Sequence, residues 1–398
     1  MVRLTSSRWR RRPLEFTILA AAVVAVALFV GGRGPEAAAG GPAASAATAA
    51  PAEAASLASS SQRILVVRRS GDHDALWLVS PADGAATAAG TLPGPAGRVA
   101  VSPNGLNVAY LPASQAPRVW IGYGPKAPKT VSLAAAGVKA VDGLTWISAD
   151  RILVSGVVSG TFARPDRDRL FVVTVSTGKA SAFRDLRGTE PSAAPGVGKV
   201  AYVRLTTVAP ADALHPDAPL IRESLRILRL PGSGAGRELT YERYRRFADH
   251  RAFQEPKLSP SGAWLLTEQT GSDVSVTYSL RESGSGFPFF TLSSGNLPAA
   301  AWDSTGRKVA FAATPAPFSQ SSISVWVFDV HTGAMVRTPA AAVKDQQITD
   351  LAWAADGAIA VGTRTTGSAA GMRRILVAPG DLTGVTGLGA GRLPVWVD

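Results

Sequence analysis

The chain contains no cysteine and only four histidines in its 398 residues. Without cysteine there can be no disulfide bond, no thiolate metal site, no catalytic cysteine and no lipidated N-terminal cysteine. Four scattered histidines also leave little material for a metal site or an acid–base cluster. We therefore expect neither a bound metal nor a cofactor.

Common catalytic motifs are missing as well. The sequence has no Gly-x-Ser-x-Gly, no His-Glu-x-x-His and no Gly-Lys-Ser/Thr phosphate-binding loop, which are the signatures of several hydrolases and nucleotide-binding enzymes. The formal net charge is +12, but the sequence has no continuous basic and aromatic groove of the kind that binds nucleic acid. We expect no nucleic-acid partner.

The N-terminus has the pattern of an export signal or a membrane anchor. Residues 1–12 form a basic tail that includes Arg8, Arg10, Arg11 and Arg12. Residues 13–32 contain a long apolar run and are just long enough to cross a bilayer as one helix, with the basic tail in the cytoplasm. Two interpretations stay open, a single-pass anchor, which we favour, and a cleaved signal peptide that releases a secreted protein. Both predict that the rest of the chain is extracytoplasmic.

Residues 33–61 are almost wholly Ala, Gly, Pro and Ser. Such a stretch buries too little apolar surface to offset its ordering entropy, so we expect a disordered linker. The folded domain is therefore predicted to span residues 62–398.

One phrase recurs six times in this domain: the end of an apolar strand, a small polar turn and a second apolar strand. The turn phrases are Val-Ser-Pro-Asn-Gly (101–105), Trp-Ile-Ser-Ala-Asp (146–150), Pro-Gly-Val-Gly (195–198), Leu-Ser-Pro-Ser-Gly (258–262), Trp-Asp-Ser-Thr-Gly (302–306) and Trp-Ala-Ala-Asp-Gly (353–357). A repeat of four-strand length is typical of radially arranged sheets, because one unit must stack on its neighbours to bury its faces. The prediction is an all-β fold, a β-propeller.

The two ends of the domain are expected to complete one blade together. The first blade begins at its second strand, near residues 63–68, with no turn phrase before it. Residues 393–398 repeat the missing first-strand phrase, and pairing them with 63–68 would close the ring and remove exposed sheet edges. Counting this composite blade gives seven blades, or six if the weak unit at 195–198 is not a blade.

Tryptophans recur at two equivalent strand positions. Trp146, Trp302, Trp353 and Trp396 share the first, and Trp77, Trp120 and Trp326 share the second. Recurrence at one structural position indicates core between blades, although an aromatic stripe could also line a ligand slot.

The turn phrases, the third strands that end in Thr-Gly and the exported context resemble the TolB-like and WD40-like propeller repeats of bacterial envelope proteins. The resemblance covers residues 62–398 and implies a propeller that binds proteins. The sequence also resembles the propeller half of LpqB-type lipoproteins, but it lacks their lipidation cysteine and upstream domain, and it leaves no room for the small α/β domain that precedes the TolB propeller.

Strand direction predicts which face of the ring carries the binding surface. The tight turns fall on one face, and the long insertions between second and third strands share the other face with the connectors between blades; long loops on a rigid scaffold commonly carry binding. The candidate binding residues on this face are Arg243, Arg245, Arg246 and Tyr244 in the connector 241–251, Arg164, Arg167 and Arg169 in the insertion 161–169, Asp72 and His73 in the insertion 68–74, and His215 in the insertion 206–222.

These segments also have purely structural interpretations. The connector 241–251 suits a short bridging helix with its aromatic side chains packed down and its charges solvated. The alternating Arg and Asp of the insertion 161–169 suit a self-paired solvated loop.

The sequence supports two functions of different classes. The favoured one is a membrane-tethered, non-catalytic and monomeric scaffold that binds an envelope protein or a cell-wall polymer. The alternative is an extracytoplasmic enzyme, a lyase, lactonase or glycan hydrolase, with its site at the loop-rich channel mouth. Three or more converging ionisable side chains with perturbed pKa values would favour the enzyme, and a broad shallow surface would favour the scaffold.

Overall fold

The computed structural model describes residues 62–124, 126–158, 168–210, 214, 219–230, 239–246, 253–270, 276–284, 288–294, 299–313, 324–338, 346–365, 372–382 and 384–397. The predicted basic tail, the segment 13–32 and the linker lie outside these residues. No helix in the described ranges is both long enough and apolar enough to span a bilayer.

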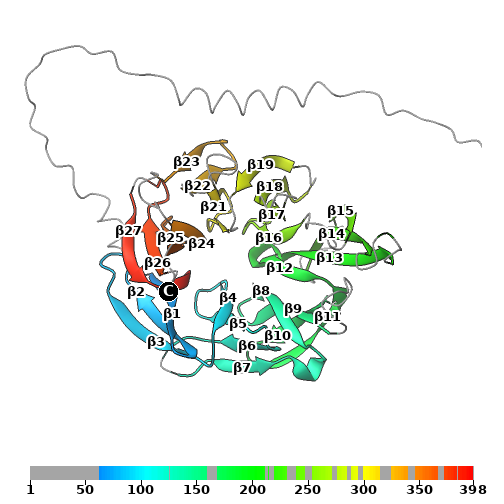
Figure 1. Ribbon diagram of the computed structural model, residues 1–398, viewed down its shortest axis with the longest axis horizontal. Helices are drawn as coiled ribbons and strands as arrows, with labels where there is room; N and C mark the ends of the chain where they lie inside the picture. The colour runs from blue at the N-terminus through cyan, green and yellow to red at the C-terminus, as the bar shows by residue number, and fades with distance from the viewer. Residues whose placement is uncertain are drawn as a thin grey trace, which may run out of the picture. The chain divides into compact units, whose positions relative to one another are not determined.

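Seven four-stranded antiparallel sheets are arranged around a central channel (Figure 1), so the structure is a seven-bladed β-propeller. From the innermost strand outward, blade 1 consists of β28 (Arg392–Val397), β1 (Arg63–Ser70), β2 (His73–Val79) and β3 (Ala86–Leu92). Blade 2 consists of β4 (Ala96–Val101), β5 (Val108–Pro112), β6 (Arg118–Ile121) and β7 (Lys129–Ser132). Blade 3 consists of β8 (Ala140–Ser148), β9 (Arg151–Val157), β10 (Asp168–Thr174) and β11 (Lys179–Arg187).

The remaining four blades follow the same order. Blade 4 consists of β12 (Thr189–Ala194), β13 (Lys199–Ala209), β14 (Leu220–Arg229) and β15 (Leu239–Arg246). Blade 5 consists of β16 (Gln254–Leu258), β17 (Trp264–Thr270), β18 (Val276–Glu282) and β19 (Pro288–Ser294). Blade 6 consists of β20 (Ala300–Trp302), β21 (Lys308–Ala313), β22 (Ser324–Asp329) and β23 (Met335–Arg337), and blade 7 of β24 (Gln346–Trp353), β25 (Ile359–Thr365), β26 (Arg373–Ala378) and β27 (Thr386–Ala390).

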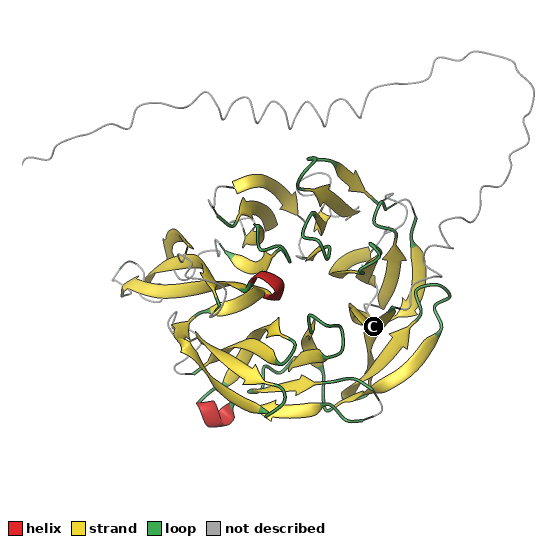
Figure 2. Cartoon of the chain, turned by 180° about the vertical axis from the view of Figure 1, so that it is seen from behind, coloured by secondary structure: helices red, strands yellow, loops and turns green. Residues whose placement is uncertain are grey.

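Helix is almost absent from the described residues. Two short 3₁₀ turns, Ala134–Ala136 and Pro195–Val197, lie between consecutive strands (Figure 2). The second of these turns lies in the weak phrase 195–198, and it joins the first two strands of blade 4. The weak unit is therefore a blade, and the count of seven is confirmed.

Blade 1 is closed by the two ends of the domain, as the sequence predicts. Strand β28 pairs antiparallel with β1, and Trp396 lies opposite Ile64. Both residues are buried in one cluster with side chains of blade 7. The pairing satisfies backbone groups that would otherwise form two open edges.

The repeated turn phrase forms the link between the first and second strands. Ser102, Ser259 and Asp303 occupy the same place in three blades, and each side-chain oxygen accepts a backbone N–H at or just before the start of the second strand, at 2.9 to 3.0 Å. The glycine that ends the phrase has a positive φ, for example 73° at Gly105 and 69° at Gly306, a conformation that other residues adopt only with strain. The phrase is thus explained by local hydrogen bonding.

The first set of recurring tryptophans links neighbouring blades. The indole Nε1 of Trp396 donates to the carbonyl of Ala352 in blade 7 at 3.1 Å, and Trp353 donates to Ala301 in blade 6 at 2.9 Å. Trp146 and Trp302 make the same bond to the preceding blade. Trp77, Trp120 and Trp326 also pack in clusters shared by two blades. The interpretation of these residues as core between blades is confirmed.

Two local predictions are wrong. The connector 241–251 was expected to suit a short helix, but Leu239–Arg246 is the outer strand β15 and pairs along its length with β14. The insertion 68–74 was expected to be a long loop, but β1 continues to Ser70 and β2 begins at His73. A two-residue turn suffices there because Gly71 adopts a φ of 61°.

Candidate functional site

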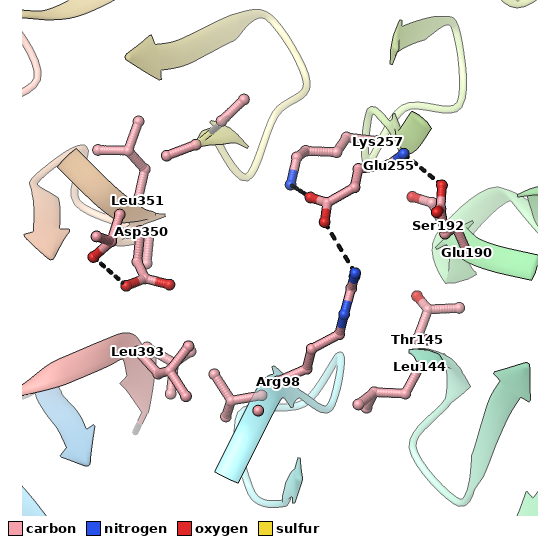
Figure 3. Close-up of a pocket in the computed structure, with 18 of the residues that line it drawn as sticks. Arg98, Leu144, Thr145, Glu190, Ser192, Glu255, Lys257, Asp350, Leu351 and Leu393 are labelled. Carbon is pink, nitrogen blue, oxygen red and sulfur yellow. Dashed lines mark hydrogen bonds and ion pairs between the residues drawn. The ribbon is translucent and has the colours of Figure 1, made fainter. Parts of the chain in front are cut away.

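The central channel contains a cavity of about 490 Å³ that residues from all seven blades line. Most of the lining residues come from the middle parts of the innermost strands, for example Arg98 on β4, Thr145 on β8 and Asp350 on β24. The cavity therefore lies within the channel, and Figure 3 shows the charged side chains that point into it.

The inner strands are irregular where they line the cavity. In six blades the ladder between the first and second strand shifts register near the start of the inner strand. Glu190, Glu255 and Leu393 occupy such shifts with φ values of 52°, 38° and 49°, and each precedes a proline. Non-glycine residues with positive φ store strain, and such residues cluster at functional sites.

An ion pair crosses the channel. Arg98 on β4 of blade 2 reaches Glu255 on β16 of blade 5, with 3.0 Å between Nη2 and Oε1 (Figure 3). Blades 2 and 5 are as far apart as two blades of a seven-bladed ring can be, so the ion pair spans the channel. Lys257 adds a second contact, with its Nζ 3.6 Å from the other Glu255 oxygen. Burial opposes ionisation of Glu255, but the charges of Lys257 and Arg98 outweigh it and hold the pKa of this carboxyl below its usual value.

Glu190 fixes the start of the neighbouring inner strand. Its Oε2 accepts the backbone N–H of Glu255 at 2.7 Å, and the Ser192 hydroxyl accepts the N–H of Leu258 at 2.9 Å. The strained backbone at Glu255 is thus held by direct bonds from blade 4.

Close approach of blades 3 and 4 depends on Gly143, because a Cβ there would lie 2.9 Å from the Pro191 ring.

Asp350 lies on the opposite side of the cavity. Its Oδ2 accepts a hydrogen bond from the Thr349 hydroxyl at 2.7 Å. Burial raises the pKa of Asp350, and the hydrogen bonds from Thr349 and from the Leu393 backbone only partly oppose this rise. A carboxyl of raised pKa and one of lowered pKa therefore line the same cavity.

Glu268 is a third carboxyl, behind the lining. It lies on β17 opposite Gln254 and is only 1% exposed. Within the described part of the chain, neither side-chain oxygen of Glu268 has a hydrogen-bond partner. Burial, together with the negative charges of Glu255 and Glu190, outweighs the charge of Lys257 and raises the pKa of Glu268 to about 8.

Those candidate residues whose side chains the structure describes do not line this cavity. Asp72 and His73 are exposed in the turn of blade 1, and Arg169 is half-buried on β10 opposite Arg187. Arg164, Arg167 and His215 lie outside the described residues. Their binding roles stay predictions.

The connector residues are divided between two faces of β15. Successive side chains of a strand point to opposite faces, so Arg243 and Tyr244 do not share one. Tyr244 is 59% exposed, whereas Arg243 lies near enough to Arg281 on blade 5 to disfavour the charge of that arginine. For Arg245 and Arg246 only the backbone, within β15, is described. By the same alternation Arg243 shares its face of β15 with Tyr241. The binding role of this segment stays a prediction.

Sequence reasoning missed the channel residues. Arg98, Glu255 and Asp350 are far apart in the chain and belong to no motif. One local signal was present: a Glu-Pro dipeptide occurs at 190–191 and again at 255–256, each before a turn phrase. A strained residue before proline, repeated in consecutive blades, would have indicated two glutamates at one level of the channel.

The described side chains contain no group of three or more His, Asp or Glu residues arranged to hold a metal ion. The cavity lining contains no histidine. The charged and hydrogen-bonding side chains that line the cavity can support recognition of a polar ligand, or proton transfer between a carboxyl and a ligand.

Comparison with known proteins adds little on function. The chain matches no known family model and no curated protein. Among solved structures, the β-propeller domain of the Trilobed protease from Pyrococcus furiosus is 10% identical to this chain, with a TM-score of 0.49. The match covers 84% of this chain and 96% of that one. A putative 6-phosphogluconolactonase from Bacteroides uniformis is 11% identical over 85% of this chain and 98% of its own, with a TM-score of 0.47.

A third similar structure is an acylaminoacyl peptidase from Pyrococcus horikoshii. It is 11% identical and has a TM-score of 0.43, and the match covers 83% of this chain and 46% of that one. These distant neighbours differ in function. The assignment of the fold rests on the strand order of the seven sheets.

Proposed function

We propose that the protein is a non-catalytic binding propeller of the cell envelope, tethered to the membrane through residues 13–32, that takes a polar segment of an envelope protein or a cell-wall polymer into the mouth of its central channel. The observation that carries the proposal is the ion pair between Arg98 and Glu255 across the channel. A TolB-like relationship of the propeller is part of the same proposal.

The cross-channel pair is suited to exchange with a ligand. The two side chains are 45% and 29% exposed, and exposed pairs of this kind contribute at most about 1 kcal/mol to stability. A ligand with a carboxylate could replace Glu255 on Arg98, and a ligand with a cation or hydroxyl could bind the released Glu255. The strained backbone of Glu255 keeps its carboxyl in place for either event.

Site-specific photo-crosslinking in the native envelope tests the proposal. The crosslinking residue replaces Thr145, which lines the channel, or Leu106, which is 63% exposed in the tight turn on the opposite face. We expect a discrete adduct from position 145 that Arg98→Ala abolishes, and none from position 106. Equal adducts from both positions, or no adduct from position 145, would reject the channel mouth as the binding site.

One observation favours an enzyme as a second candidate. Several ionisable side chains line the channel cavity, and the pKa of Asp350 is raised while that of Glu255 is lowered. Carboxyls with opposite shifts can divide the roles of general acid and general base. In this case Asp350 would donate a proton to the substrate and Glu255 would accept one.

The variant Asp350→Asn separates the two candidates. If the protein only binds, this variant keeps the adduct from position 145 and the wild-type protein releases no new product from envelope material. If it is an enzyme, mass spectrometry detects a product that accumulates with time for the wild type and is lost in Asp350→Asn.

A further inference from the structure

A second cavity lies at the junction of blades 1 and 7, and it shares no lining residue with the central channel. Its volume is about 680 Å³, and it is bounded by the end of β1, the start of β26, the link from β27 to β28, and Ala96 and Ala113 of blade 2. Four arginines line it: Arg68, Arg69, Arg373 and Arg392. No acidic residue is among its described lining residues.

Two of the four arginines are fixed by the protein. Arg392 has a side chain that is only 15% exposed; it pairs with the buried Asp74 and donates to the carbonyl of Ala96 at 2.6 Å. Arg68 donates to the carbonyl of Ala390 at 2.8 Å and lies over the ring of Trp77, 4.8 Å from its centroid. Both guanidinium groups are thus held in position before any ligand binds.

The other two arginines are exposed at the opening. Arg69 is about half exposed and lies 3.8 Å from the second oxygen of Asp74, a long contact for an ion pair. Arg373 is exposed at the first position of β26. Four positive charges therefore face two carboxyls, the buried Asp74 and Asp350, which also interacts with Arg373 and Arg392 and whose pKa is raised by burial.

The electrostatics of the cavity favour an anion. Burial lowers the pKa of Arg392, Asp74 opposes the change, and the positive charge of Arg373 adds to it. An anion placed between these guanidinium groups would remove this repulsion. Arginine also presents a planar fork of donors that matches the oxygens of a phosphate.

We propose that the cavity between blades 1 and 7 binds a phosphate group, as a free phosphate or as part of a phosphodiester polymer. The excess of at least two positive charges suits a multiply charged anion better than a single carboxylate. Arg392 and Arg68 form the fixed base of the site, and Arg69 and Arg373 complete it at the opening.

Isothermal titration calorimetry of the purified full chain tests this site. The probes are inorganic pyrophosphate, poly(glycerol phosphate) and, as a singly charged control, acetate. The test variant is Arg373→Ala, which removes an exposed charge and leaves the buried pair of Arg392 and Asp74 intact. Its matched control is Arg374→Ala, an equal loss of charge at the next residue of the same strand, whose side chain points to the other face.

We expect pyrophosphate to bind the wild type, to bind Arg373→Ala about tenfold or more weakly, and to bind Arg374→Ala as it binds the wild type. Binding of pyrophosphate alone would identify free phosphates as the ligand class, and binding of poly(glycerol phosphate) as well would identify a polymer. Lack of binding by both phosphate probes, binding of acetate as tight as that of pyrophosphate, or equal losses in the two variants would overturn the proposal.

The result is independent of the channel. Arg98→Ala removes the cross-channel pair but no lining residue of this cavity, so it should leave pyrophosphate binding unchanged. Failure of the photo-crosslinking test and failure of phosphate binding can therefore be told apart.

Discussion

Glu268 should make the stability of the propeller fall as the pH rises. This carboxyl is buried, and its pKa is raised from 4.5 to about 8 in the folded state. Between these two pH values the folded chain keeps a proton that the unfolded chain has lost, so the free energy of unfolding decreases with pH. Below pH 4.5 the residue has no such effect, and above pH 8 the loss is complete.

The size of the effect follows from the change in pKa. One pKa unit corresponds to about 1.4 kcal/mol, so the loss between pH 4.5 and 8 is on the order of 5 kcal/mol. This is a large part of the stability of an ordinary folded protein, about 5 to 15 kcal/mol. Glu268→Gln, which resembles the protonated acid, should remove this part of the pH dependence.

Urea unfolding followed by far-UV circular dichroism measures the difference between the two proteins at pH 5, 6, 7 and 8. We expect similar stability at pH 5, and a Glu268→Gln variant that is several kcal/mol more stable than the wild type at pH 8. Glu282→Gln, an exposed carboxyl in the same blade, is the control and should follow the wild type. Parallel pH profiles for wild type and Glu268→Gln would refute the reasoning, since the buried acid would then be ionised at little cost.

Three further substitutions test how the blades are held together, each by urea unfolding. Trp396→Ala removes a buried indole from the closing strand and should cost about 3 to 5 kcal/mol, whereas the exposed Leu106→Ala should cost less than about 0.5 kcal/mol; equal costs would argue against closure through β28. Gly143→Ala places a Cβ 2.7 Å from a serine hydroxyl and 2.9 Å from a proline ring of the next blade, and we expect a loss of about 1 to 3 kcal/mol; an unchanged midpoint would show that the blades can separate freely there. Asp74→Ala leaves Arg392 buried without its carboxylate and should cost about 3 to 5 kcal/mol; a loss below 1 kcal/mol would show that the arginine moves into solvent.

The fold could be predicted because its signals are local and repeated. In three blades the turn phrase places a hydroxyl or carboxylate where it accepts a backbone N–H at or just before the start of the next strand, as at Ser102 and Asp303. The long-range pairing of β28 with β1 was also predictable, because the first blade lacked a strand and the C-terminal segment matched the missing phrase.

The channel site was not predictable in the same way. Arg98 and Glu255 are separated by 157 residues and meet only because the ring closes with the two blades on opposite sides of the channel. The connector shows that a local pattern can also be ambiguous. Residues 241–246 mix charged and aromatic side chains in a pattern that suits a strand or a helix, and pairing with β14 decides between them. Local pattern determines the repeat, whereas closure of the ring determines which charges meet.

A charge exchange across the channel tests the central claim most directly. The measured quantity is the yield of the photo-crosslinked adduct from position 145 in wild type, Arg98→Glu, Glu255→Arg and the double variant. If the pair recognises a ligand, both single variants lose the adduct, and the double variant restores the ion pair but not the adduct, because the positions of the two charges are reversed. Full recovery of the adduct in the double variant would contradict the account, since the pair would then serve only to hold the channel in shape.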